Sequence, residues 1–134
     1  MKRYILILLA TVCNSHADTI DHYMNIVEQI PQMEMKADQQ SQVWAKSSRT
    51  VLELTCDSII DSLMISNEEA KKNGTPLFCP PQGTVISPEQ LNLMIQNAYR
   101  ANMSKTSDKN NMTVSQVALV SLKKKYPCAK NDEY

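Results

Sequence analysis

Apolar side chains near the start of the chain recur at the spacing of an α-helix. They stand at positions i, i+3, i+4 and i+7, which share one helix face, and they are Ile20, Tyr23, Met24, Val27 and Ile30. Asp18 or Thr19 can cap the start of this helix. Pro31 lacks a backbone N–H and is the expected stop. The pattern therefore predicts a first helix that ends at Pro31.

The next stretch is less regular. Residues 32–46 are mostly polar and weakly periodic, and we predict a second helix there. A sharper apolar stripe begins after Arg49 and predicts a third helix that runs to about Lys72, where Asn73-Gly74 supplies a C-terminal stop. That stripe consists of Leu52, Cys56, Ile59, Ile60 and Leu63. The predicted junction between these two helices is Lys46, Ser47, Ser48 and Arg49.

Two capping boxes mark helix starts in the second half of the chain. Ser87-Pro88-Glu89-Gln90 and Thr113-Val114-Ser115-Gln116 each place a hydroxyl residue three positions before a glutamine, the signature of a helix N-terminus. The first predicted helix ends near Asn102, and the second ends at Tyr126-Pro127-Cys128. With a polar loop between them, the pattern predicts an all-α bundle of about five helices in one domain, residues 18–134.

The first 17 residues have the organisation of a secretory signal peptide. Lys2 and Arg3 precede an apolar run, residues 4–12, and Ser15-His16-Ala17 offers small residues for cleavage. The run is shorter than the roughly 20 residues that span a bilayer. We therefore expect residues 1–17 to be a signal peptide and the mature chain to be soluble and exported. Acylation at Cys13 is an alternative that Val12, just before it, fits poorly.

Charge and glycine content narrow the possible partners. The full chain has 14 basic and 14 acidic residues, and loss of Lys2 and Arg3 leaves a small acidic excess. Such a balance gives no electrostatic footprint for nucleic acid or for an anionic membrane. Gly74 and Gly83, the two glycines of the chain, cannot form a phosphate-binding glycine loop.

Three cysteines remain after removal of the signal peptide. Cys79 precedes the last two predicted helices and Cys128 follows them. In an oxidising compartment two cysteines should pair, and a Cys79–Cys128 bridge would clasp the two ends of this helix pair. Cys56 lies on the apolar stripe of the third helix. It is either a buried, unreactive thiol or a partner in an intermolecular bridge.

The sequence offers little for catalysis or metal binding. His22, the one histidine outside the signal peptide, is predicted on the exposed side of the first helix, and a nucleophilic Ser or Cys usually needs a histidine base. The cysteine spacing lacks the close pairs of a zinc site. The acidic pairs of the third helix and the lysines that close the last one fit a solvated helix face and a helix C-terminus. We therefore expect neither an enzyme nor a bound metal or cofactor.

The C-terminal third resembles a known family. Its motifs are Phe78-Cys79-Pro80-Pro81, Val85, Gln90-Leu91, and residues 117–122 followed by Tyr126-Pro127-Cys128. They are similar to the paired C-terminal signatures of the Rap/Tai immunity proteins of bacterial type VI secretion. In the third helix the family often has Cys-x-Gly-Tyr-Ile-x-Gly, where this chain has serines in place of both glycines and Ile59 in place of tyrosine. The surface near that helix therefore need not match that of a relative.

The resemblance implies a function in binding. It suggests a periplasmic immunity protein, often a homodimer, that inhibits a peptidoglycan amidase effector, a papain-like cysteine peptidase delivered by neighbouring cells. A small helical periplasmic chaperone that binds unfolded proteins is the main alternative. An inhibitor must fill or cover a catalytic cleft, and a short polar loop on a stiff scaffold suits that task. The candidate partner-binding residues are the Lys46–Arg49 junction and the loop of Ser104, Lys105, Thr106, Ser107, Asp108, Lys109 and Asn110.

Overall fold

The computed structural model describes residues 18–102 and 112–129 of the 134-residue chain. The helices in these ranges are α1 (Ile20–Glu34), α2 (Gln39–Lys72), α3 (Pro88–Asn102) and α4 (Val114–Lys125). The described residues form no strand, although an isolated antiparallel bridge joins Thr19 to Thr113. The all-α prediction is confirmed, with four helices in the described part instead of about five.

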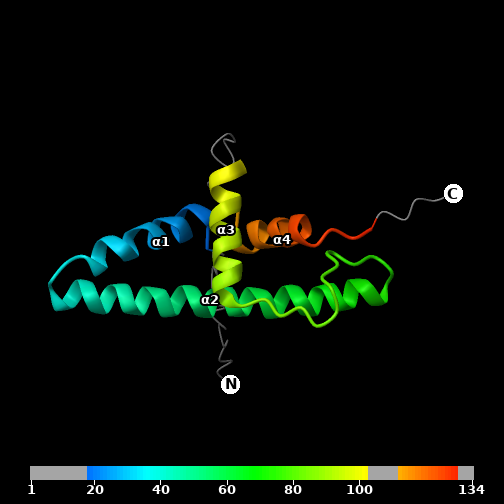
Figure 1. Ribbon diagram of the computed structural model, residues 1–134, viewed down its shortest axis with the longest axis horizontal. Helices are drawn as coiled ribbons and strands as arrows, with labels where there is room; N and C mark the ends of the chain where they lie inside the picture. The colour runs from blue at the N-terminus through cyan, green and yellow to red at the C-terminus, as the bar shows by residue number, and fades with distance from the viewer. Residues whose placement is uncertain (1–17, 103–111, 130–134) are drawn as a thin grey trace, which may run out of the picture.

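The arrangement is built on the 34-residue α2. At 1.5 Å per residue this helix is about 51 Å long, and it spans most of the molecule, with α1, α3 and α4 all on one side of it (Figure 1). The segment from residue 73 to residue 87 turns back along α2 before α3 begins. Helix α3 crosses α2 steeply. None of the described helices is both long enough and apolar enough to cross a membrane.

The second and third predicted helices are one continuous helix, so the prediction of a junction at Lys46–Arg49 is wrong. The chain turns instead at residues 35–38, and Asp38 caps α2 by accepting a hydrogen bond from the Ser41 backbone N–H at 2.8 Å. No proline or glycine interrupts residues 39–72. Buried Ala45, Leu52 and Cys56 continue one apolar face through the serine pair, so packing carries the helix past a locally polar stretch.

The prediction that α1 ends at Pro31 is also wrong, because the helix continues to Glu34. Proline removes one helical hydrogen bond, but its own carbonyl still accepts from the Met35 backbone N–H at 3.2 Å. Ile30 is buried and Met33 packs against the core from the next turn. Burial of these side chains favours one more turn over an end at the proline.

The other helix boundaries agree with the sequence. Ser87 and Gln90 exchange the two hydrogen bonds of a capping box, as do Thr113 and Gln116. Gly74 ends α2 with a φ of 77°, in the left-handed region that favours glycine. The largest fully buried side chains come from all four helices and from the segment after α2, and they include Ile20, Tyr23, Met24, Cys56, Phe78, Leu91, Ile95, Val117 and Leu122.

Candidate partner-binding surfaces

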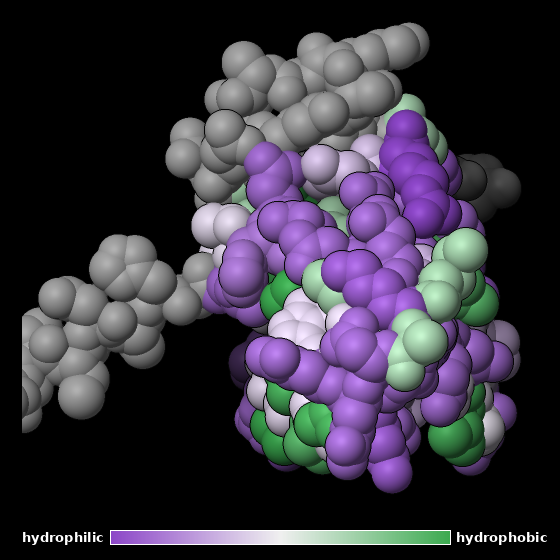
Figure 2. All heavy atoms as spheres, turned by 90° about the vertical axis from the view of Figure 1, so that its left-hand side faces the viewer, coloured by the Kyte–Doolittle hydropathy of each residue, from purple (hydrophilic) through white to green (hydrophobic). Residues whose placement is uncertain are grey.

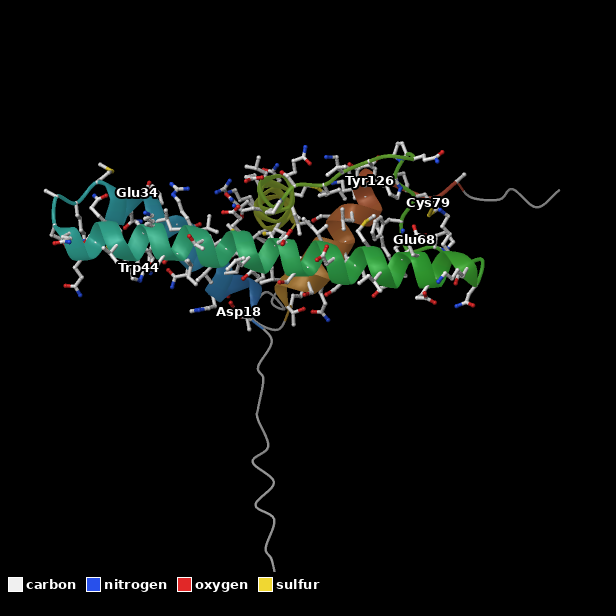
Figure 3. The ribbon with its side chains drawn as sticks, turned by 90° about the horizontal axis from the view of Figure 1, so that it is seen from below. Asp18, Glu34, Trp44, Glu68, Cys79 and Tyr126 are labelled. Atoms are coloured by element: carbon white, nitrogen blue, oxygen red, sulfur yellow. A yellow bond between two sulfur atoms is a disulfide. The ribbon has the colours of Figure 1, made fainter. Side chains whose placement is uncertain are left out.

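The side of α2 that faces away from the other helices carries exposed apolar side chains. Val43, Val51, Leu54 and Ile65 are between 55% and 67% exposed. At 100° per residue they fall within about 80° of one another, opposite the buried face of the helix. We call these four residues the outer stripe. Figure 3 looks onto this part of the molecule, with α2 in front along its whole length.

A groove of about 570 Å³ borders the outer stripe. Val51 and Leu54 form one side of it, and Asp18, Thr113 and Ser115 from the starts of α1 and α4 form the other. Two backbone hydrogen bonds hold these helix starts together: Ile20 N–H to Met112 O at 2.9 Å and Val114 N–H to Asp18 O at 3.2 Å. The outer stripe therefore continues into a fixed depression.

The end of the molecule that holds the connection between α1 and α2 is different. It is hydrophilic over most of its surface, with separate hydrophobic patches (Figure 2). Here Arg49 donates two hydrogen bonds to Glu34, from Nε at 2.6 Å and from Nη2 at 2.8 Å. These bonds hold the pKa of the Glu34 carboxyl below its usual range and raise the pKa of Arg49.

The four candidate residues of the predicted Lys46–Arg49 junction therefore have different environments on one continuous helix. Arg49 ties the end of α1 to α2, Ser48 is half-buried, and Lys46 and Ser47 are exposed on a helix. They do not form a protruding loop. The other candidate segment, Ser104–Asn110, lies outside the described residues, which place only the helices on either side of it.

The predicted bridge between Cys79 and Cys128 is present and joins residues 49 apart in sequence, with their Cα atoms 4.8 Å apart. Next to it, the Cys79 backbone N–H donates to Tyr126 O at 2.8 Å. We call this disulfide the clasp. It lies beside the C-terminal part of α2, where Glu68 and Cys79 are on the same side of the molecule (Figure 3). It therefore ties the end of α4 to the segment that follows α2.

Asn67 fixes the same segment and was missed by the sequence analysis. Its side chain, 2% exposed, accepts from the backbone N–H groups of Leu77 and Phe78 at 2.8 and 3.1 Å, and donates to Phe78 O at 2.9 Å. A signal existed, because Asn67 stands four residues after Leu63 on the core side of the helix. A polar residue at such a position must find partners.

No family model, curated protein or solved structure matches this chain.

Cys56 is a free, buried thiol. This agrees with the first of the two roles considered from the sequence, a buried and unreactive thiol, and not with an intermolecular bridge. The Tyr23 hydroxyl lies 3.2 Å from its Sγ and donates to Asn92 Oδ1 at 2.7 Å, which leaves the thiol to donate to the hydroxyl. Burial raises the pKa of Cys56, and burial together with this contact raises that of Tyr23. The cluster joins α1, α2 and α3, and its thiol is neither exposed nor activated.

The other titratable side chains that were considered for catalysis or metal binding are exposed to solvent. His22 is 60% exposed, as predicted, with its Nε2 3.8 Å from Asp18. The acidic pairs Asp57 with Asp61 and Glu68 with Glu69 are exposed along α2. Across residues 18–102 and 112–129, no three His, Cys, Asp or Glu side chains gather where they could hold a metal ion.

Three large side chains of types that often anchor protein interfaces, Arg100, Tyr99 and Trp44, differ in exposure. Arg100 is exposed, with Nη2 3.2 Å from Gln96 Oε1. Tyr99 is half-buried and donates to Asp21 Oδ1 at 2.9 Å. Trp44 is half-buried against the core. Of the three, Arg100 is the one whose residue is exposed.

Proposed function

We propose that this protein is a periplasmic immunity protein that binds and inhibits a type VI secretion peptidoglycan amidase, a papain-like cysteine peptidase. The observation that carries the proposal is the clasped C-terminal half. Its Phe-Cys-x-Pro segment and its closing Tyr126-Pro127-Cys128 resemble the Rap/Tai signatures, and their two cysteines form the disulfide. The protein acts by binding, without catalysis, metal or cofactor of its own.

The mechanism follows from a stiff scaffold. The clasp closes the chain around α3 and α4, and the bridge between Thr19 and Thr113 fixes the start of α4 against α1. A segment held between two such helices loses less conformational entropy on binding than a free loop does. Ser104–Asn110 connects these helices in sequence, and its hydroxyl, amide and charged side chains suit a polar catalytic cleft.

Coexpression with candidate amidases tests this function. The exported protein should copurify with one amidase at a fixed stoichiometry and abolish hydrolysis of peptidoglycan peptides, and cells that lack it should lyse when that amidase reaches their periplasm. Replacement of residues 104–110 by a Gly/Ser linker should release the amidase without unfolding the protein. If the protein instead suppresses aggregation of many unrelated proteins and inhibits no amidase, it is a chaperone and the proposal is wrong.

The outer stripe of α2 supports a homodimer. Positions 47, 51, 54, 58, 61 and 65 are spaced alternately by four and three residues, the spacing of a helix–helix seam. In an antiparallel pair with its two-fold axis at Leu54, Val43 would face Ile65 of the second copy and Ser47 would face Asp61. The two-fold pairing of one patch with itself is the usual form of a homodimer interface.

Leu54→Glu should dissociate this dimer, because it places two carboxylates at the two-fold axis. We expect at least about a tenfold weaker association, equivalent to roughly 1.4 kcal/mol, measured by sedimentation or light scattering over a range of concentrations. Val85→Glu is the matched control, since Val85 is an 85% exposed apolar residue in the segment after α2 and does not belong to the outer stripe. A wild-type chain that stays monomeric, or a dimer that survives Leu54→Glu, would rule this interface out.

A further inference from the structure

Acidic and basic residues are distributed unequally among the four described helices, although their numbers balance over the whole chain. Helices α1 and α2 contain eight acidic and four basic residues, whereas α3 and α4 contain four basic residues and one acidic residue, Glu89. Glu89 lies in the first turn of α3 and lines a different groove, next to Arg49. The C-terminal halves of α3 and α4 therefore form a positive region without a carboxylate of their own.

A groove of about 390 Å³ lies within this region, between α3 and α4. Its apolar part is formed by Met94, Ala98, Ala101 and Val120, and its basic part by Lys124 and Lys125; we call it the basic groove. Val120 is 51% exposed although it belongs to the groove. Each of the four other grooves described in the structure includes at least one acidic residue in its lining.

Within residues 18–102 and 112–129, the lysines of the basic groove form no ion pair with a carboxylate. The ion pairs found among the described residues are formed by side chains of α1, α2 and Asp18, and none involves α4. Lys125 Nζ lies 5.5 Å from the centre of the Tyr126 ring, a cation–π contact that does not neutralise the ammonium charge. The helix dipole accounts for cations in the last turn. It does not account for an adjoining apolar groove whose lining, among the residues that the structure describes, includes no acidic side chain.

We infer that the basic groove docks an acidic amphipathic helix of a protein partner. Apolar side chains on one face of that helix would enter between α3 and α4, and carboxylates at its edge would reach Lys124 and Lys125. A groove between two helices suits this mode of recognition, and the lysines would set the partner's orientation and speed the encounter. This surface is separate from the outer stripe, and the inference holds whatever the enzymatic class of the partner.

Two synthetic amphipathic peptides test the inference on the full mature protein. Both carry leucines at i, i+3, i+4 and i+7, one flanked by glutamates and the other by lysines. Fluorescence anisotropy should show that the glutamate peptide binds at least about tenfold more tightly, and that added salt weakens its binding. Lys124→Glu/Lys125→Glu should reverse this preference, and Ala101→Trp, which fills the groove without a change in charge, should weaken both peptides.

Lys71→Glu/Lys72→Glu is the matched control. It makes the same change in charge at the end of another helix, where the lysines already pair with Glu68 and Glu69. It should leave peptide binding unchanged, with circular dichroism confirming that each variant is folded. Binding of neither peptide, equal binding of both, or equal loss in the two double variants would overturn the inference. Self-association that disappears with Lys124→Glu/Lys125→Glu would also overturn it, because the groove would then belong to a second copy.

Discussion

Replacement of Cys79 and Cys128 by serine should lower the free energy of unfolding by up to about 4 kcal/mol. The bridge joins residues 49 apart in sequence, and the chain-entropy model gives this value for a loop of that length. A domain of this size has a total stability of roughly 5–15 kcal/mol. The midpoint of thermal unfolding, followed by circular dichroism, should therefore fall by roughly 15 °C.

The effect of a reductant on the unfolding midpoint distinguishes the contribution of the disulfide from other effects of replacing the two cysteines. Addition of a reductant should bring the wild-type midpoint down to that of the double variant and leave the double variant unchanged. Cys56→Ser is the control, because it removes a buried thiol yet keeps the bridge, and it should remain sensitive to reductant. A double variant as stable as the oxidised wild type would show that the clasp contributes nothing to the stability of the fold.

The helix starts that the sequence predicted correctly depend on neighbouring residues. Ser87 with Gln90, and Thr113 with Gln116, satisfy backbone groups three residues apart, so the helix starts can be recognised without the rest of the fold. Cysteine pairing was predictable for a different reason. The chain was expected to be exported, and with Cys79 and Cys128 at the two ends of a helix pair there are few alternative pairings.

The errors arose where packing across the molecule outweighs local preference. The serine pair within α2 and Pro31 within α1 both indicate a break in isolation, and burial of side chains against other helices overrides them. The outer stripe could be recognised only once α2 was known to be one helix. The basic groove required the fold itself, because a net charge summed along a chain says nothing about where charges gather in space.

Asn67→Ala should have the second large effect on stability, about 3 kcal/mol. It leaves the backbone N–H groups of Leu77 and Phe78 and the carbonyl of Phe78 without their partner, and a buried polar group left unpaired costs about 1–3 kcal/mol. Entry of water would offset part of this sum. Urea unfolding measures the change, and hydrogen exchange should show lost protection of those two amides.

Ser66→Ala is the matched control for this substitution. Ser66 is the adjacent residue on α2, is exposed, and donates from its hydroxyl to Ser62 O within the same helix. Its replacement should change stability by less than about 0.5 kcal/mol. If Asn67→Ala unfolds at the same urea concentration as Ser66→Ala, the segment after α2 is held by other contacts.

The combination of both changes reveals how the two restraints cooperate. Asn67 holds Leu77 and Phe78 on α2, and the disulfide holds the next residue, Cys79, at the end of α4. Residues so close together that restrain one segment do not contribute independently. Once the bridge is absent the segment can detach more easily, so Asn67→Ala should cost less in the Cys79→Ser/Cys128→Ser protein than in the wild type. Simple addition of the two losses would mean that Asn67 and the disulfide stabilise the protein independently.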